Sequence, residues 1–234
     1  MQRIIIIGAT SGIGRALAKF YAEVGNRIGI VGRRVELLES LRAEQPDKFV
    51  SQQLDVTEIA SVEDKLNKLA DELGGLDLLI ISSGTGELNP TLDFVVERPT
   101  LETNVLGFTA VADWAYRYFE KQGAGHLVGI SSIAALLGEA EAPAYSATKA
   151  FQANYLEALR SRSKKSGGKI AVTEIRPGFV DTAMAKGDGK FWVAPVEKAA
   201  KQIVIAIKKR RKIAYITKRW RLIGLVLRLL KVLE

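Results

Sequence analysis

The feature that most constrains the fold of this chain is a glycine-rich turn placed directly after its first apolar run. The run Ile4–Ile7 is followed by Gly8-Ala9-Thr10-Ser11-Gly12-Ile13-Gly14, and a helical pattern opens at the end of this turn. Glycines permit a sharp turn and a close approach of the backbone to a ligand. The unpaired N–H groups of a helix N-terminus favour an anion such as a pyrophosphate. The sequence therefore predicts a phosphate-binding unit, although a plain tight strand–helix connection has the same signature.

Short apolar runs alternate with amphipathic stretches along the rest of the chain. The expected strands are Arg3–Ile7, Arg27–Val31, Lys48–Leu54, Leu76–Ile81, His126–Ser131, Lys169–Ile175 and Lys212–Ile216. The expected helices are Gly14–Val24, Ile59–Leu73, Thr103–Lys121, Ala144–Ser163 and Val196–Ile207. Near-continuous apolar strands are typical of parallel sheets that are covered on both faces. The pattern predicts an α/β, doubly wound fold with a central parallel sheet of about seven strands. We expect one domain over residues 1–217, with residues 218–234 as a helical extension of it.

Composition and charge exclude several classes of site. The 234 residues include no cysteine, so disulfides, thiolate metal sites and cysteine nucleophiles are excluded. The run after Met1 is too short for a signal peptide, and no stretch approaches the roughly 20 apolar residues that span a bilayer. Ten of the 34 Lys and Arg residues but only one of the 26 acids lie between Lys208 and Glu234, so the body of the chain is close to neutral. The absence of cysteine fits a reducing cytoplasm, and we expect a cytoplasmic protein. We expect no binding of nucleic acid, because these cations are mixed with Leu and Val.

Two arginines stand at the end of the second expected strand, in Ile30-Val31-Gly32-Arg33-Arg34. In dinucleotide-binding folds an acid at this place binds the ribose 2′-OH, whereas Arg accommodates a 2′-phosphate. Because the acid is absent, the sequence predicts NADP(H) as the cofactor rather than NAD(H). The alternative is that Arg33 and Arg34 only begin a solvated helix.

Four polar residues are candidates for catalysis. Tyr145 and Lys149 are four residues apart on an expected helix and therefore share a face. A neighbouring cation favours the phenolate, which makes a phenol a usable acid and base near neutral pH. Ser132 follows a strand at the sheet edge where doubly wound folds bind ligands, and Asn104 lies in the helix expected over Thr103–Lys121. Strand-end capping by Ser132 and a local backbone hydrogen bond from Asn104 are the structural alternatives.

Together these residues resemble the short-chain dehydrogenase/reductase family, and the resemblance covers most of the chain. The matching positions are Gly8, Gly12 and Gly14 for the glycine motif, Asp55 for the acid after the third strand, Asn104, Ser132, Tyr145 and Lys149 for the catalytic set, and residues 176–182 for a later proline–glycine motif. Two positions depart from the family pattern. Ile81-Ser82-Ser83-Gly84 stands where Asn-Asn-Ala-Gly is usual, and Ser11 stands where many NADP-preferring relatives carry a basic residue.

The resemblance implies a Rossmann fold and direct hydride transfer at a nicotinamide, with no metal. Tyr145 would be the general acid/base, and Lys149 would lower its pKa and bind the nicotinamide ribose. Ser132 would orient the reacting oxygen, and Asn104 would support a water in the proton relay. The residues expected to bind the cofactor are Gly8, Thr10, Ser11, Gly12, Ile13, Gly14, Arg33, Arg34, Asp55, Val56, Gly84, Tyr145, Lys149, Pro177, Gly178, Val180 and Thr182. The resemblance also implies a homodimer or homotetramer, formed through the two helices that flank the strand before Ser132.

Two segments near the C-terminus are expected to act on the substrate side or at a surface. Thr182–Val193 is expected to be a mobile lid, hinged at Gly187 and Gly189, in which Met184, Phe191 and Trp192 cover an apolar ligand. A plain surface loop is the alternative. Lys218–Leu233 would form an amphipathic helix with cations on one side and leucines on the other. This helix fits a membrane surface, its own domain or a second subunit equally well.

The function expected from these features is interconversion of an alcohol and a ketone or aldehyde by an NADP(H)-dependent oxidoreductase. The small-molecule substrate is expected to be apolar or lipid-like. The alternatives are a non-catalytic NADP(H)-binding sensor and an interaction protein recruited to a membrane by the C-terminal helix.

Overall fold

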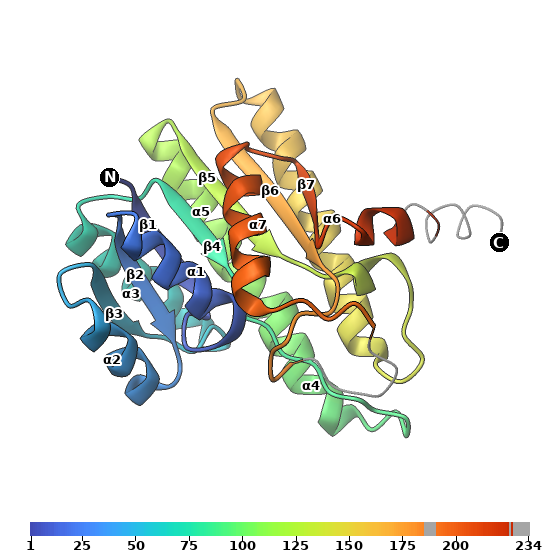
Figure 1. Ribbon diagram of the computed structural model, residues 1–234. Coiled ribbons are helices and arrows are strands. Elements are labelled where there is room, and N and C mark those ends of the chain that lie inside the picture. The colour runs from blue at the N-terminus through green and yellow to red at the C-terminus, as the bar shows by residue number, and fades with distance from the viewer. Residues whose placement is uncertain (185–190, 225, 227–234) are drawn as a thin grey trace.

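The computed structural model describes residues 1–184, 191–224 and 226. Its centre is a parallel sheet of seven strands in the order β3-β2-β1-β4-β5-β6-β7 (Figure 1). The strands are β1 (Arg3–Ile7), β2 (Arg27–Gly32), β3 (Phe49–Gln53), β4 (Leu78–Ile81), β5 (Gly125–Ile130), β6 (Ile170–Pro177) and β7 (Ile213–Ile216). Each apolar run predicted to be a strand forms one, with ends within two residues of the prediction. The expected doubly wound α/β fold is confirmed.

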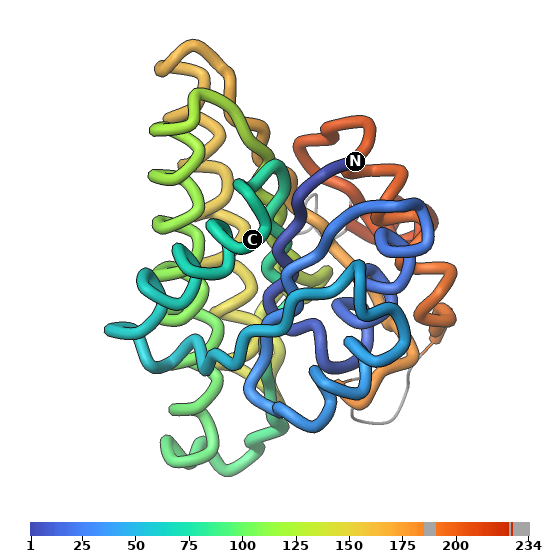
Figure 2. Tube along the Cα trace, turned by 90° about the vertical axis from the view of Figure 1, so that its left-hand side faces the viewer, coloured from blue at the N-terminus to red at the C-terminus, as the bar shows by residue number. Residues whose placement is uncertain are grey.

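Helices cover both faces of this sheet, as Figures 1 and 2 show from two sides. On one face lie α1 (Gly12–Glu23), α2 (Val35–Glu44) and α7 (Val196–Lys208). On the other face lie α3 (Ile59–Leu73), α5 (Phe108–Gln122) and α6 (Pro143–Lys165). A further helix, α4 (Phe94–Leu101), packs against α6. The sheet is therefore the middle one of three layers.

Two helices were not predicted from the sequence, and a third is interrupted. The ten residues of α2 bury only Leu38 and Leu41, and α4 buries only Thr100 and contains Pro99. Both helices therefore lack the long apolar stripe by which an amphipathic helix is identified. The single helix expected over Thr103–Lys121 opens instead with a π-helical turn at Glu102–Gly107 and continues as α5.

The four consecutive isoleucines of β1 show why its sequence lacks polar alternation. Successive side chains of a strand point to opposite faces. Ile4 and Ile6 join the apolar cluster under α1 and α7, whereas Ile5 and Ile7 join the cluster under α3 and α5. All four side chains are fully buried, because both faces of the sheet are covered. Burial of this kind stabilises a fold by roughly 25 cal/mol per Å² of apolar surface.

The strands that follow β1 in the chain are added first on one side of β1 and then on the other. Strand β1 pairs with β2 on one side and with β4 on the other. Connections on the two sides of such a point run to opposite faces, and this leaves a crevice at the carboxyl ends of the strands. The glycine-rich turn follows β1, and the Ile81-Ser82-Ser83-Gly84 segment follows β4, so both lie at this crevice.

The first turn of the expected C-terminal helix packs on the body of the protein. Residues 220–224 are helical, and the buried Trp220 ring makes edge contact with Phe179. Leu222 and Val226, by contrast, are 70% and 53% exposed. The rest of the expected helix, residues 225 and 227–233, lies outside the described residues. Among the helices described, none combines the length and hydropathy that crossing a membrane requires.

Candidate active site

The glycine-rich turn is packed so closely that side chains would not fit. Gly8 has a φ of +86°, and a Cβ there would lie 2.6 Å from the Ser83 amide nitrogen. A Cβ on Gly14 would lie 2.2 Å from the carbonyl oxygen of Gly8. The amides of Gly8 and Ala9 both donate to the carbonyl of Val31, which ties the turn to the end of β2. The helix α1 then begins without a side-chain cap, so its N-terminus suits a phosphate.

Arg34 joins the end of β2 to the same turn. Its Nη2 donates to Thr10 Oγ1 at 2.7 Å and to Ser11 Oγ at 2.9 Å. Arg33 is 64% exposed, and its Nη1 lies 3.6 Å from Asp55 Oδ2. Burial acts to raise the pKa of Asp55, but hydrogen bonds from the N–H and hydroxyl of Thr57, together with Arg33, hold this pKa below its usual value. The carboxylate is therefore charged and faces one of two cations that could bind a phosphate.

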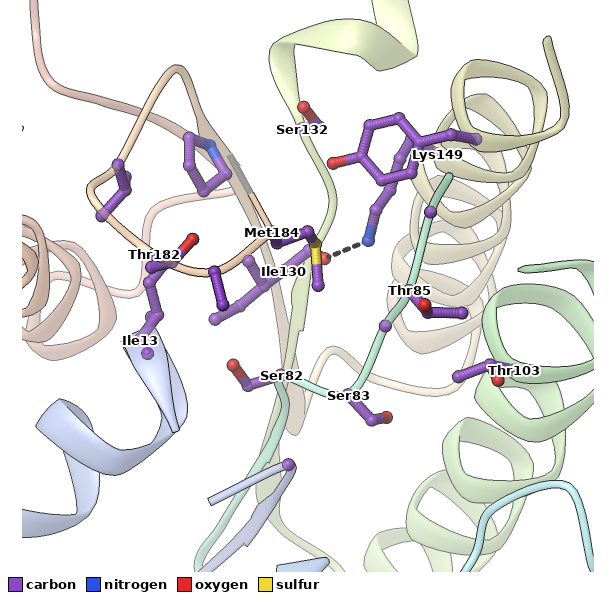
Figure 3. A pocket seen from close by; sticks show the side chains of 18 of the residues that line it. Ile13, Ser82, Ser83, Thr85, Thr103, Ile130, Ser132, Lys149, Thr182 and Met184 are labelled. Carbon is purple, nitrogen blue, oxygen red and sulfur yellow. Dashed lines mark hydrogen bonds between the residues drawn. The ribbon is translucent and has the colours of Figure 1, made fainter. Parts of the chain in front are cut away.

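Tyr145 and Lys149 come from the first turns of α6, which begins with Pro143 at a position that proline favours. Lys149 is buried and donates to the Ile130 carbonyl at 3.2 Å and to Gln152 Oε1 at 3.0 Å. Its Nζ lies 5.7 Å from the centre of the Tyr145 ring. Figure 3 shows the hydrogen bond from Lys149 to the Ile130 carbonyl at the end of β5. Burial lowers the pKa of Lys149 to about 8.

Ser132 both caps a turn and faces the phenol. Its hydroxyl accepts a hydrogen bond from the Ala134 amide at 3.1 Å, at the start of the 3-10 turn Ile133–Leu136. Burial raises the pKa of Tyr145, and Glu139 adds to this effect, whereas the hydrogen bond with Ser132 lowers it. The net direction is opposite to the lowering expected from Lys149. The reason is that the desolvation of a phenolate in this wall of the site outweighs the favourable contacts.

Asn104 lies in the π-helical turn and is fully buried behind the site rather than at its surface. Its Oδ1 accepts from the Thr85 amide at 2.9 Å. Its Nδ2 donates to the Thr85 carbonyl at 2.7 Å and to Thr148 Oγ1 at 3.0 Å. The side chain thus joins the segment after β4 to α6. π-helical turns of this kind are frequent at functional sites.

Sequence reasoning missed the polar residues that hold this set together, which are Thr85, Thr148 and Gln152. Gln152 is fully buried, and its Nε2 donates to the Asn104 carbonyl at 2.9 Å. One signal was present in the sequence. Gln152 lies three residues after Lys149 and seven after Tyr145, so it shares their helix face.

A cleft of about 720 Å³ connects the phosphate turn with the Tyr145 side of the site. All the predicted site residues line this cleft except Gly14 and Asn104, which lie behind its surface. Those at the surface are Gly8, Thr10, Ser11, Gly12, Ile13, Arg33, Arg34, Asp55, Val56, Gly84, Ser132, Tyr145, Lys149, Pro177, Gly178, Val180 and Thr182. A Cβ on Gly84 would lie 3.3 Å from both Lys149 Nζ and Asn104 Oδ1, so a side chain here would crowd these two groups.

The structure describes the two ends of the segment expected to be a lid. Met184 lines the cleft, where Figure 3 shows it between Thr182 and Lys149. Phe191 and Trp192 do not line it and instead pack around the Trp220 ring. Arg219 lies 4.9 Å from the centre of the Trp192 ring and donates to the Trp192 carbonyl. The expected hinges Gly187 and Gly189 lie outside the described residues.

Comparison with known proteins matches this arrangement to one family. A family model described as short chain dehydrogenase matches residues 2–191. An uncharacterised oxidoreductase of Myxococcus xanthus is 36% identical over 185 residues, which are 77% of this chain and 72% of the relative.

Two solved structures have the same fold. A short chain dehydrogenase from Burkholderia cenocepacia in complex with NADP has a TM-score of 0.82 at 22% identity, over 95% of this chain and 91% of that one. A short chain dehydrogenase/reductase from Burkholderia phymatum in complex with NAD has a TM-score of 0.85 at 19% identity and the same coverage. The match of the family model over most of the chain identifies this protein as an oxidoreductase that belongs to the short-chain dehydrogenase family.

Proposed function

We propose that this protein is an NADP(H)-dependent oxidoreductase that interconverts an alcohol and a ketone or aldehyde. One observation carries the proposal. Tyr145, Lys149 and Ser132 lie together on one wall of the cleft, and the glycine-rich phosphate turn lies at its other end. A cleft of about 720 Å³ is within the usual size range of sites for cofactors and small molecules.

The residues present fit a nicotinamide dinucleotide. The tight turn that Gly8 and Gly14 permit, and the uncapped start of α1, suit a pyrophosphate. Asp55 and Val56 line the cleft beside the end of β3, where they would contact the adenine. Pro177, Gly178, Val180 and Thr182 line the other end, where they would hold the nicotinamide. When bound in this cleft, the cofactor supplies or accepts the hydride.

Tyr145 acts as the general acid when a carbonyl is reduced. As the carbonyl carbon gains a hydride, the oxygen takes the phenolic proton, and the product is an alcohol. Ser132 donates a hydrogen bond that orients this oxygen. The raised pKa of Tyr145 keeps the phenol protonated, which suits this direction, and the Lys149 ammonium stabilises the phenolate that is left. Oxidation of the alcohol reverses the proton transfer, with the phenolate as the base.

Two cations support NADP(H) over NAD(H). Arg33 and Arg34 both line the cleft at the end of β2, and Thr10 and Ser11 hold the Arg34 guanidinium in place. Guanidinium groups bind phosphate with charge-assisted hydrogen bonds. The Asp55 carboxylate beside Arg33 is already engaged by Thr57 and Arg33. The two arginines therefore suit the 2′-phosphate that distinguishes NADP(H).

The substrate side of the cleft carries four large apolar side chains, and these support an apolar or lipid-like carbonyl substrate. Leu88, Ile133, Phe179 and Met184 line it. We further propose a homodimer or homotetramer formed through α5 and α6, where Phe151 is 36% exposed and stacks on Tyr155.

Peripheral contact with a membrane through residues 218–234 stays a prediction. The division into a domain over residues 1–217 and a helical extension also stays a prediction, as does the cytoplasmic location. Exposed Arg221, Leu222 and Val226 support a surface role for this segment. Buried Trp220 supports the alternative, in which the helix belongs to its own domain.

Fluorescence titration with NADPH and NADH, followed by assays on a panel of apolar aldehydes and ketones, tests the proposed function. We expect tighter binding of NADPH and its oxidation by members of the panel. Binding of NADPH without turnover on any carbonyl would favour a non-catalytic sensor. Failure of both dinucleotides to bind would contradict the proposal at its first step.

A further inference from the structure

Gln152 joins two parts of the site, Lys149 on α6 and the π-helical turn that carries Asn104. Its Oε1 accepts a hydrogen bond from Lys149 Nζ at 3.0 Å, and its Nε2 donates to the Asn104 carbonyl at 2.9 Å. The side chain is fully buried on the inner face of α6. Each of its polar atoms therefore has a partner inside the protein, as a buried amide requires.

We propose that Gln152 is a positioning residue of the active site, whose amide joins the Asn104 carbonyl to the Lys149 ammonium and holds Lys149 towards Tyr145. This inference rests on the proposed function, because it assigns a role within the same catalytic set. It also adds to the expected role of Asn104, whose carbonyl accepts a hydrogen bond from a buried side chain.

The hydrogen-bonding capacity of Asn104 shows why the bridge needs a separate amide. Its Oδ1 is engaged by the Thr85 amide. Both of its Nδ2 hydrogens are engaged, by the Thr85 carbonyl and by Thr148. The Asn104 side chain therefore fixes the wall of the site and has no donor left for a relay. Its carbonyl is the atom that links this wall to Lys149, and Gln152 makes that link.

The polarity of the bridge fixes the direction of the Gln152 amide. An ammonium has three donors and no acceptor, so the oxygen of the amide must face Lys149. The NH₂ group must then face the Asn104 carbonyl. The reversed amide would place its NH₂ group against the donors of Lys149 and its oxygen against the Asn104 carbonyl, so neither end would form a hydrogen bond. The bridge therefore has a single satisfied orientation.

The same bridge determines where the Lys149 donors point. Gln152 and the Ile130 carbonyl accept two of the three hydrogens of the ammonium. The third stays available for the side of the cleft on which Tyr145 lies, 5.7 Å away at its ring centre. Without Gln152 the buried cation keeps one of these two acceptors. Its charged form would be less stable, and its direction would be set by the Ile130 carbonyl alone.

The charge of Lys149 provides a readout that does not depend on turnover. Burial lowers its pKa to about 8. Among the described residues that line the cleft with Lys149, the titratable groups on this side are Tyr145 on the same helix, Glu139 and Glu141 before it, and Glu87 after β4. Of these, Glu139 raises the pKa of Tyr145. Loss of a hydrogen bond to the ammonium lowers the pKa of Lys149 further, whereas a carboxylate in the same place raises it.

The experiment compares Gln152→Leu, Gln152→Ala and Gln152→Glu with the wild-type chain. Gln122→Leu is the control, because the Gln122 amide donates to two carbonyls, those of Leu76 and Ala124, away from the cleft. NMR of chains labelled with ¹³C-lysine follows the Lys149 ε-carbon against pH without any cofactor. Steady-state assays with NADPH and the best carbonyl then give kcat and KM against pH.

We expect Gln152→Leu to lower the Lys149 pKa by about one unit and kcat by about tenfold or more, with KM for the carbonyl within about twofold. Gln152→Ala leaves room for a water and recovers part of kcat. Gln152→Glu raises the Lys149 pKa, and this readout also serves if Gln152→Leu fails to fold. Gln122→Leu leaves kcat and the Lys149 pKa unchanged.

The inference would be overturned if a folded Gln152→Leu protein kept both the Lys149 titration and kcat unchanged. An unchanged Lys149 titration in Gln152→Glu would also overturn it. Its failure can be distinguished from failure of the proposed function. A wild-type chain that reduces no carbonyl contradicts the proposed function, while the Lys149 titration still decides whether the bridge operates. An active wild-type chain with no response at Gln152 contradicts the bridge alone.

Discussion

The Arg34 guanidinium hydrogen-bonds the Ser11 hydroxyl at 2.9 Å, so the end of β2 and the phosphate turn present one surface. Arg33 adds a second cation to this surface and is 64% exposed. We predict that Arg33→Ala raises the dissociation constant for NADPH by about tenfold or more, because a charge-assisted hydrogen bond contributes about 1.5–3 kcal/mol. The constant for NADH should change much less. Fluorescence titration with both cofactors measures the difference.

Arg42→Ala is the matched control for this prediction. Arg42 is an exposed arginine of α2 whose partner is Glu39, and it does not line the cleft. Its removal should change neither dissociation constant. Equal losses of NADPH and NADH affinity in Arg33→Ala would remove the reason for choosing NADP(H).

His126 should make the protein less stable in acid. It is buried on β5, with Nε2 2.8 Å from Thr173 Oγ1, and burial together with Arg210 lowers its pKa from 6.5 to about 4. Between these two pH values the unfolded chain binds more protons at this site than the folded chain does. The free energy of unfolding therefore falls as the pH is lowered through this window, by about 3 kcal/mol from this group.

Urea unfolding at pH 6.5 and pH 4 measures this contribution, with His126→Gln as the reference. The variant has no titrating group at this position, so the carboxylates that titrate in both proteins cancel in the comparison. We expect the wild-type chain to lose about 3 kcal/mol more than the variant between the two pH values. An identical pH dependence in both proteins would contradict the neutral, buried state of His126.

The ion pair of Glu174 and Arg176 should be sensitive to the loss of one partner. Arg176 Nε lies 2.6 Å from Glu174 Oε1, with the two side chains 6% and 0% exposed, and Ser131 donates to the same carboxylate. Glu174→Gln leaves a buried cation without its counter-charge, which costs about 3–5 kcal/mol. Urea denaturation should show this loss. Glu63→Gln, at the exposed pair with Arg117, should cost less than about 1 kcal/mol.

Removing both partners of this pair provides the decisive comparison. Glu174→Leu with Arg176→Leu should destabilise the protein less than Glu174→Gln alone, because no unpaired charge is then buried. A double variant that is less stable than the single one would show that the pair contributes more than its desolvation costs.

The strands and the main site residues could be predicted from the sequence because their signals are local. Four consecutive isoleucines indicate a strand buried on both faces, and the glycines of the phosphate turn are required by contacts that leave no space for a Cβ. Tyr145 and Lys149 meet because four residues make about one helical turn. The isoleucine run and the Tyr145–Lys149 spacing depend on residues close together in the chain, and the glycine motif is recognisable in the sequence although Gly8 is confined by the distant Ser83.

The parts that were missed depend on contacts between distant residues. Gln152 and Asn104 are 48 residues apart, and no pattern along the chain shows that their polar groups meet. The packing of Phe191 and Trp192 on Trp220 likewise depends on how the end of the chain folds back on the body. The effect of burial, which raises the pKa of Tyr145, was missed for a related reason, since burial is a property of the folded chain.

The most direct test of the proposed chemistry is the turnover of Tyr145→Phe beside its affinity for NADPH. Tyr155→Phe is the matched control, because Tyr155 lies on the same helix and its hydroxyl donates to Asp113 away from the cleft. We predict that Tyr145→Phe lowers kcat for carbonyl reduction by about 10²–10⁴-fold. Its NADPH dissociation constant should stay near the wild-type value, and Tyr155→Phe should stay active. Turnover by Tyr145→Phe at the wild-type rate would contradict the assignment of Tyr145 as the general acid/base.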